Sequence, residues 1–264
     1  MRRDFLIGMG LLASVAAGAG SAVAADIPVR PAAAPAMVAP TFVPDWVGFY
    51  VGIHGGGGGA HVTHDPAFVD PFDDPLGLSS FSRPNTSPSG GVFGFQFGHN
   101  WQWGPAVGGL EIDFSGADIK DTTTFFHPLF AGILGFNRDF KIDKLASARG
   151  RLGYLIFPNW LLYGTAGIGW GHSRMNETAF VVGAPTTTAF QRSEINEFGW
   201  VVGAGVEFKF WNNWLLRGEW LHYDFGRTNQ FELGTFVGVD TFNSTPVTVR
   251  TTVDVGRAAL SYKF

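Results

Sequence analysis

The chain has 264 residues, of which 45% are apolar, 15% aromatic and only 15% charged, and it contains no cysteine. Soluble domains carry about 25% charged residues and disordered chains lack aromatics, so the composition excludes a disordered protein and is unusual for a soluble one. The formal net charge of −4 argues against nucleic acid as a partner, because nucleic-acid binding needs a concentrated basic surface, and the lack of cysteine excludes disulfides and thiolate metal sites.

The N-terminus has the pattern of a secretory signal peptide. A short basic start precedes an apolar run at 5–20 and a small-x-small cleavage site at 22–24. We expect residues 1–24 to be cleaved, which takes away two arginines and one aspartate and leaves a net charge of −5. Residues 25–44 are rich in proline and alanine and predict an extended periplasmic lead-in. Residues 45–264 remain to form the fold.

From residue 46 onward, large apolar side chains alternate with small or charged ones. In the run that holds Phe198, Trp200, Val202 and Ala204, the intervening positions include glycine and single ionisable residues. A soluble sheet would carry lysine, glutamate and threonine on its wet face. Here the minor face suits a narrow, crowded interior and the bulky face suits lipid. The pattern therefore predicts a transmembrane β-barrel.

The alternation predicts eight strands with two kinds of connection. The expected strands lie near 46–58, 91–101, 106–118, 144–156, 160–172, 196–210, 214–225 and 251–264. Short turns are expected at 102–105, 157–159 and 211–213, and four long external loops at 59–90, 119–143, 173–195 and 226–250. Short periplasmic turns and long external loops are typical of outer-membrane proteins. We predict an all-β fold, an eight-stranded antiparallel up-and-down transmembrane β-barrel.

The tryptophans lie where membrane interfaces are expected. Six of the nine stand at the start of the first strand and at the short turns, namely Trp46, Trp101, Trp103, Trp160, Trp211 and Trp214. The other three, Trp170, Trp200 and Trp220, fall near the opposite ends of their strands. This distribution predicts two aromatic girdles, which a bilayer favours.

Four stretches carry a family resemblance. They are WVGFYVG at 46–52, ASARGRLGYL at 146–155, YGTAG at 163–167 and LSYKF at 260–264. Together they resemble the small outer-membrane β-barrel family of alphaproteobacteria, often labelled porin-family or RopB-like, over nearly the whole mature chain. The resemblance implies an OmpA-type eight-stranded barrel in the bacterial outer membrane. It also implies insertion by the barrel-assembly machinery, since the C-terminal pattern of Phe264, Tyr262 and Leu260 resembles the signal which that machinery reads.

Ten ionisable residues fall at positions that the alternation turns inward. The acids are Glu111, Asp113, Glu197, Glu207 and Glu219, and the bases are Arg149, Arg151, Lys209, Arg217 and Arg257. Five acids face five bases, so the expected interior is neutral. Because an eight-stranded barrel is only wide enough for side chains to fill it, unpaired charges there would be costly. We therefore predict a salt-bridge network that closes the lumen.

The sequence gives weaker support for ligand binding or enzymatic activity than for a barrel. His61 and His64, near acidic residues of the first expected loop, could hold a metal or haem iron, and some relatives in the resembling family are described as haemin binders. The only adjacent serine–histidine pair, His172-Ser173, would point to opposite faces of a strand, so we expect no enzyme. We expect no cofactor, with haem as the one candidate. We interpret the sequence as that of a structural barrel that presents external loops. A loop-mediated binder of haem or a host ligand is one alternative, and a small diffusion pore is another. The sequence leaves the oligomeric state open.

Overall fold

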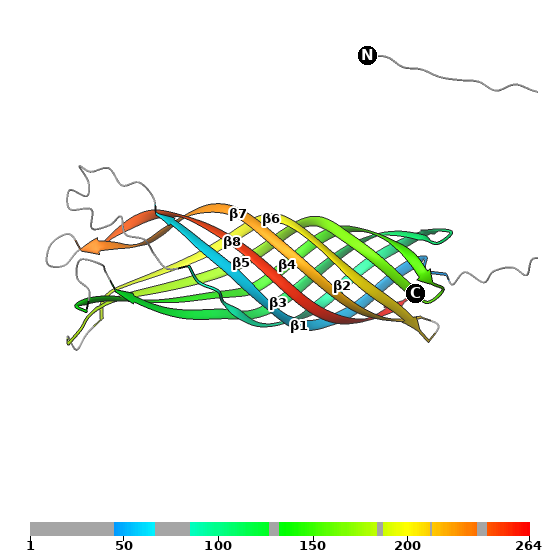
Figure 1. Cartoon of the computed structure of the whole chain (residues 1–264), viewed down its shortest axis with the longest axis horizontal. Helices are drawn as coiled ribbons and strands as arrows, with labels where there is room; N and C mark the ends of the chain where they lie inside the picture. Colours follow the sequence, from blue (N-terminus) through cyan, green and yellow to red (C-terminus); the bar gives the residue numbers. More distant parts are fainter. Residues whose placement is uncertain (1–44, 67–84, 127–131, 184–186, 212, 237–241) are drawn as a thin grey trace, which may run out of the picture. The chain divides into compact units, whose positions relative to one another are not determined.

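Eight antiparallel strands close into a single barrel. The computed structural model describes residues 45–66, 85–126, 132–183, 187–211, 213–236 and 242–264. The strands are β1 (Gly48–Pro66), β2 (Ser89–Trp103), β3 (Ala106–Phe126), β4 (Leu134–Phe157), β5 (Trp160–Val181), β6 (Thr187–Phe210), β7 (Trp214–Phe236) and β8 (Phe242–Lys263). Each strand pairs with the next, and β1 pairs with β8 (Figure 1). The predicted all-β, eight-stranded up-and-down barrel is confirmed, while the expected signal peptide and lead-in, 1–24 and 25–44, lie outside the described residues.

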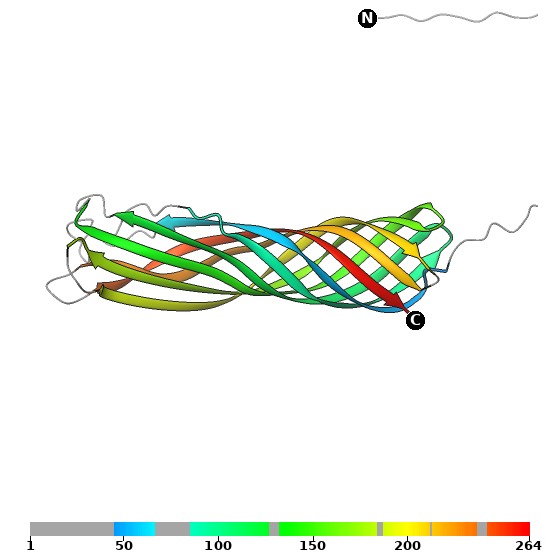
Figure 2. The same cartoon turned by 90° about the horizontal axis from the view of Figure 1, so that it is seen from below.

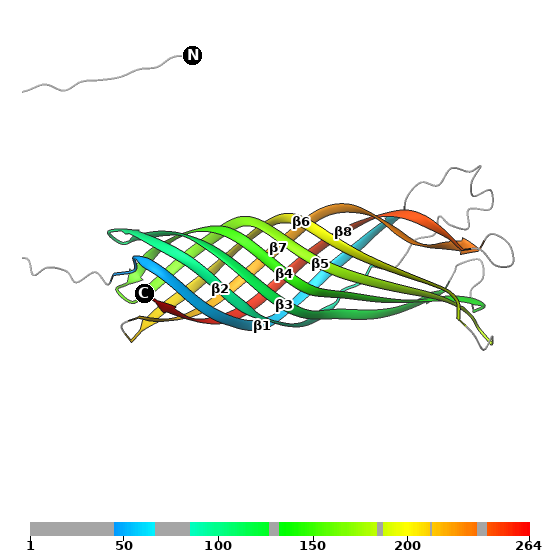
Figure 3. The same cartoon turned by 180° about the vertical axis from the view of Figure 1, so that it is seen from behind.

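The strands run obliquely around the whole circumference, as the views from below and behind show (Figure 2, Figure 3). Three tight connections, at 104–105, 158–159 and 211–213, stand at one end of the barrel, where sequence analysis expects short turns. Phe264 reaches the same end, and its N–H donates to the Phe49 carbonyl at 2.8 Å. We call this end the turn end and the opposite one the far end. In the described part of the chain, no helix is long and apolar enough to span a bilayer.

Toward the far end the strands are much longer than expected. β3 continues to Phe126 and β4 begins at Leu134, so most of the segment expected as a loop at 119–143 is strand. The strand bounds leave 22 residues between β1 and β2 but only seven, five and five residues in the other three connections at this end. The expectation of four long loops is therefore wrong. Most outward side chains of these extensions are polar, as where Thr122 Oγ1 donates to Asp139 Oδ1 at 2.7 Å, and only single phenylalanines such as Phe126 and Phe190 interrupt them. The extensions therefore lack the apolar alternation that marks a strand in the sequence.

The outward face carries a broad apolar belt. Leu152, Ile168 and Phe198 are 68%, 67% and 73% exposed, which fits a surface that faces hydrocarbon. Val202 and Ala204 also point outward and Gly203 inward, as predicted for β6. Exposed tryptophans gather at the turn end, namely Trp101, Trp103, Trp160, Trp211 and Trp214, while Trp200 and Trp220 are exposed farther along their strands.

Trp46 departs from this pattern because it is fully buried. It precedes β1, and the chain there folds into the mouth of the barrel. Its N–H donates to Gln102 Oε1 at 2.8 Å and its indole N–H to the Pro158 carbonyl at 3.3 Å. The alternation of a strand cannot place a residue that lies before the strand, so the assignment of Trp46 to the aromatic girdle is corrected.

Glycines on the inward face make room for large side chains. A Cβ at Gly169 on β5 would lie 2.8 Å from Cδ1 of Tyr223, which reaches it from β7. A Cβ at Gly98 would likewise overlap the Tyr50 ring. The interior is therefore crowded, because aromatic rings lie directly against the barrel wall where glycine leaves space.

Candidate functional site

Eight charged side chains from five strands meet inside the barrel, in the half nearer the turn end. All are at most 6% exposed, and four are acids and four are arginines. We call them the charged layer: Glu111, Asp113, Arg149, Arg151, Glu207, Arg217, Glu219 and Arg257. Their positive and negative charges balance, which lowers the cost of burying them.

Some of these ion pairs join neighbouring strands. Arg149 Nη2 on β4 lies 2.6 Å from Glu111 Oε1 and 3.1 Å from Asp113 Oδ2, both on β3. Arg217 Nη2 on β7 lies 3.1 Å from Glu207 Oε2 on β6. Neighbouring inward positions on adjacent strands face each other, so these pairs are consistent with the predicted alternation.

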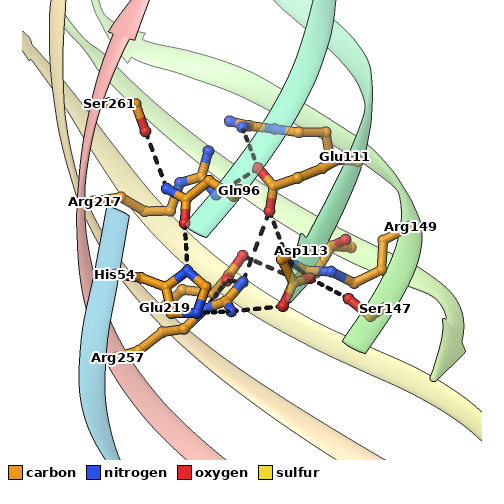
Figure 4. A network of polar contacts seen from close by, with 12 residues as sticks. His54, Gln96, Glu111, Asp113, Ser147, Arg149, Arg217, Glu219, Arg257 and Ser261 are labelled. Atoms are coloured by element: carbon orange, nitrogen blue, oxygen red, sulfur yellow. Dashed lines mark hydrogen bonds and ion pairs between the residues drawn. The ribbon is translucent and has the colours of Figure 1, made fainter. Parts of the chain in front are cut away.

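Other ion pairs cross the lumen. Arg151 Nη2 on β4 lies 2.6 Å from Glu207 Oε2 on β6, and Arg217 Nη1 on β7 lies 2.6 Å from Glu111 Oε2 on β3. Arg257 Nη1 on β8 donates to Asp113 Oδ1, also on β3, at 2.9 Å (Figure 4). All three contacts join strands that are not neighbours in the sheet, and β3 and β7 lie opposite each other in the ring, so the charged layer extends across the interior instead of lining it.

Two tyrosines complete the layer. Arg151 lies over the Tyr163 ring at 4.3 Å and over the Tyr50 ring at 5.6 Å, and Arg217 lies 5.6 Å from both rings. The Tyr50 hydroxyl donates to Glu111 Oε2 at 2.5 Å. The cations thus have aromatic faces as well as carboxylates around them. Sequence analysis missed both tyrosines, although each stands at an inward position of its strand.

A neutral polar chain extends the charged layer toward β1 and β2. His54 Nδ1 lies 2.6 Å from Gln96 Oε1, whose amide nitrogen donates to Ser261 Oγ at 3.0 Å (Figure 4). His54 Nε2 lies 2.8 Å from Ser115 Oγ and 3.3 Å from Arg257 Nη1. Since the amide oxygen can only accept and the guanidinium can only donate, His54 carries its proton on Nδ1 and is neutral. These polar side chains were not predicted from the sequence.

Two of the ten expected residues do not join the charged layer. Lys209 lies at the mouth of the turn end, where its ammonium donates to the Asp45 backbone carbonyl at 2.8 Å. Glu197 is buried farther along the lumen, and Thr251 Oγ1 donates to it at 3.4 Å. Within the described ranges neither forms an ion pair with an arginine of the charged layer. The alternation gives the face of a residue but not its height along the barrel, so the inclusion of Lys209 and Glu197 is corrected.

Apolar side chains fill the lumen on both sides of the charged layer. The turn-end apolar layer consists of Trp46, Val107, Leu155, Leu161, Tyr163 and Leu215. The far apolar layer consists of Ala60, Val62, Val92, Ile119, Phe140, Ile142, Leu145, Met175, Val201, Leu221, Tyr223, Phe225, Val249, Val253 and Val255. A water path along the axis would have to cross all three layers.

The two histidines expected to share a ligand lie on opposite faces of β1. His61 is exposed, with Nδ1 3.4 Å from Ser87 Oγ, whereas His64 is 6% exposed and its Nε2 lies 3.1 Å from Arg138 Nη1. The prediction of a joint His61–His64 loop site is therefore wrong, since three residues along a strand reverse the face. No group of three or more metal-ligating side chains occurs in the described residues.

The terminal residues expected as an assembly signal share the outward face. Phe264 is 69% and Leu260 36% exposed, and the Tyr262 ring lies 5.3 Å from both the Phe264 and Trp214 rings. The C-terminal strand β8 thus presents an apolar row beside the aromatic residues of the turn end. Its recognition by the barrel-assembly machinery stays a prediction.

Comparisons with known proteins agree with this architecture. A sequence profile described as an outer membrane protein beta-barrel domain matches residues 12–253. The chain is 33% identical over 259 residues to the 31 kDa outer-membrane immunogenic protein of Brucella melitensis, covering 96% of this chain and 98% of the relative. It is 34% identical over 130 residues to the 22 kDa outer membrane protein of Rhizobium leguminosarum bv. viciae, covering 48% and 49% of the two chains.

Among solved structures, the barrel is similar to the outer membrane protease OmpT of Escherichia coli, with a TM-score of 0.49 and 11% identity, over 86% of this chain and 99% of that one. The sequence profile and the Brucella relative each cover most of the chain. Short turns in such proteins face the periplasm, so we expect the far end of this barrel to face the exterior. The chain belongs to the outer-membrane β-barrel family, as its resemblance to small alphaproteobacterial members predicts, and the protein resides in the bacterial outer membrane.

Proposed function

We propose that the protein is a structural, non-conducting outer-membrane barrel that presents its external end at the cell surface. The observation that carries this proposal is the charged layer, in which the ion pairs Arg151–Glu207 and Arg217–Glu111 join strands that are not neighbours in the sheet, each at 2.6 Å. An ion entering the lumen would have to displace several charge-assisted hydrogen bonds at once. Each such bond is worth about 1.5–3 kcal/mol, so spontaneous opening would be rare.

The two apolar layers support the same proposal. Trp46 closes the periplasmic mouth, and Tyr223 and Phe225 lie across the lumen on the external side of the charged layer. Apolar constrictions oppose ion passage because they offer no replacement for the hydration shell. Charged and apolar closure would therefore act in series.

Surface presentation rests on the external extensions of the strands and on the longest external connection, between β1 and β2. The Brucella relative is described as immunogenic, which for that protein implies exposure to a host. For this chain we propose only that its external end is exposed at the cell surface. An acyl-transfer or hydrolase role has little support, because His172 faces outward and Ser173 is 2% exposed in the lumen.

Conductance in planar bilayers tests the closed lumen. The wild-type protein is expected to give no stable conductance, or rare small openings. Arg217→Glu should increase the frequency of opening, because it places a carboxylate against Glu111 and Glu207. Arg192→Glu serves as the control, because it reverses the charge of a side chain that is 55% exposed on the outward face. A large, steady, ion-selective conductance of the wild type would establish the diffusion pore and disprove the closed barrel.

Haem or host-ligand binding remains the second alternative from the sequence. With His61 and His64 on opposite faces, a site that uses both has lost its support. A haem titration followed by absorbance, on wild type and on His61→Ala, separates the alternatives. Saturable binding that is lost in the variant would favour a binder over a structural role.

A further inference from the structure

The outward face of β4 forms an apolar groove in the membrane belt. Its floor consists of small residues, Ala146 and Ala148, with Gly150 next along the strand. Phe114 and Ile112 stand beside the two alanines on β3, and Trp170 and Ile168 on β5. These larger side chains form two ridges, and the groove between them has a volume of about 180 Å³.

The width of the groove suits one hydrocarbon chain. The two ridges stand on strands that flank β4, about 9–10 Å apart at the backbone, and their side chains narrow the space between them. The wall is apolar throughout, with Phe114 49% and Ile168 67% exposed. A surface of this shape in the bilayer contacts lipid tails, and a tail lying along β4 would cover the alanines.

A cation stands directly above the groove. Lys144 is the next outward residue of β4 on the external side, and it is exposed. In the described part of the chain it forms no ion pair. Its neighbour Asp143 is already bound by Arg174, whose Nη2 lies 2.6 Å from Asp143 Oδ2, so the Lys144 ammonium remains available.

A β-bulge fixes this arrangement. The pairing of β4 with β5 shifts register between Ile142 and Lys144. Ile142 is buried in the lumen although it lies only two positions before the outward Lys144, and residues two apart on a regular strand share a face. The extra residue Asp143 therefore switches the face. Bulges commonly re-aim side chains at barrel rims. The groove and the cation are thereby aligned on one strand.

The neighbouring rows mark the edge of the membrane. The Trp170 ring, at the external end of the groove, stacks on His172 at 6.4 Å. Beyond it, charged residues stand on the outward face of β3 and β4, with Lys141 Nζ of β4 2.7 Å from Asp118 Oδ1 of β3. Aromatic rings prefer the headgroup level. Lys144 therefore stands where the phosphates of outer-leaflet lipids lie.

We propose that this groove binds a phosphorylated glycolipid of the outer leaflet, with one acyl chain along Ala146, Ala148 and Gly150 and a phosphate against Lys144. The apolar floor would contact the acyl chain, and the Lys144 ammonium, which forms no ion pair among the described residues, would bind the phosphate. Neither contact involves the lumen, so the proposal is independent of whether the barrel conducts. The small floor residues separate the two ridges that stand on β3 and β5.

Native mass spectrometry of the folded full-length protein tests the proposal. The barrel is reconstituted with bis-phosphorylated lipid A, with dephosphorylated lipid A, or with phosphatidylglycerol, and is then released into mild detergent. We expect one lipid A to be retained per barrel and about tenfold less of the dephosphorylated form, the factor that one charge-assisted hydrogen bond represents. Phosphatidylglycerol should also be retained less, because its phosphodiester carries a single negative charge and lipid A carries two phosphate monoesters. Equal retention of phosphatidylglycerol would overturn the assignment to glycolipid.

Two variants and two matched controls locate the site. Lys144→Gln should lower lipid A retention about tenfold while leaving the dephosphorylated lipid unchanged. Ala148→Phe fills the groove and should lower retention of both. Ala204→Phe makes the same exchange on outward β6, and Arg250→Gln removes an exposed cation of β8; both should retain lipid as wild type does. Heat-modifiable migration verifies folding, and unchanged retention in Lys144→Gln and Ala148→Phe would disprove the site.

Discussion

The charged layer and the far apolar layer fill the same narrow lumen by different means. In the charged layer, each arginine position is set by directional bonds, as for Arg257, which donates to Asp113 Oδ1 at 2.9 Å and to Glu219 Oε2 at 2.8 Å. In the far apolar layer, ring and aliphatic volumes are matched to glycines such as Gly169. The first depends on charge balance and the second on shape, so the two layers should fail in different ways.

The largest effect is expected in the charged layer. Arg149→Glu would place a carboxylate beside Glu111, Asp113 and Glu219 and remove their shared cation. Removing one partner of a buried pair costs about 3–5 kcal/mol, and reversing its charge costs more. Urea unfolding in lipid vesicles, followed by tryptophan fluorescence, measures the loss. Arg149→Met removes the positive charge without adding a negative one, so it should lower the free energy of unfolding less than Arg149→Glu does. If Arg149→Glu were as stable as the wild type, the charges of the layer would not depend on one another.

The far apolar layer should respond to volume. Tyr223→Ala is expected to lower the free energy of unfolding by about 3–5 kcal/mol, because it leaves a cavity against β5. Gly169→Ala alone should also destabilise, since its Cβ would lie 2.8 Å from the Tyr223 ring. In the Tyr223→Ala background the same exchange should be tolerated. A double-mutant cycle by urea unfolding measures this coupling, and strictly additive effects would contradict the packing.

The outward face differs from both lumen layers, because it depends on contact with lipid and not on charge balance or close packing. Ala204→Arg would expose a cation to hydrocarbon and should cost about 2–4 kcal/mol near the bilayer midplane. Ala204→Leu keeps the surface apolar and should fold as wild type does. Folding yield into vesicles, read from heat-modifiable migration, compares the two. Equal yields would mean that residue 204 does not face lipid.

The smallest effect is expected at the periplasmic mouth, outside the membrane. Burial is the largest single influence on Asp45 and opposes its ionisation, but the Val47 N–H at 2.8 Å and the Lys263 ammonium at 3.3 Å together outweigh it and hold the pKa of the carboxyl below its usual value. The stabilisation is therefore present above the ordinary pKa, about 3.9, and is lost as the pH falls through the lower folded value. Asp45→Asn should flatten this part of the pH–stability profile; an unchanged acid limb would show that Asp45 contributes nothing.

Much of the fold is readable in the sequence because lipid imposes a period of two on the residues that face it. Phe198, Trp200 and Val202 mark the outer surface of β6 without reference to any other strand. The strand extensions past the membrane could not be found this way, since water accepts polar side chains in any order. The extension of β3 to Phe126 is supported instead by its pairing with β4, which only the folded barrel displays.

The candidate site also has some features that the sequence predicts and others that only the folded barrel shows. Local alternation determines that Glu111, Arg149 and Arg217 turn inward, and adjacency along the chain predicts the Glu111–Arg149 pair. Tertiary structure alone decided that Arg217 reaches Glu111 across the lumen, that Lys209 stays at the mouth, and that Trp46 folds inside. The physical reason is that strand tilt and closure set the height of each side chain along the axis. Periodicity encodes the face of a residue, and only the closed sheet encodes what lies opposite it.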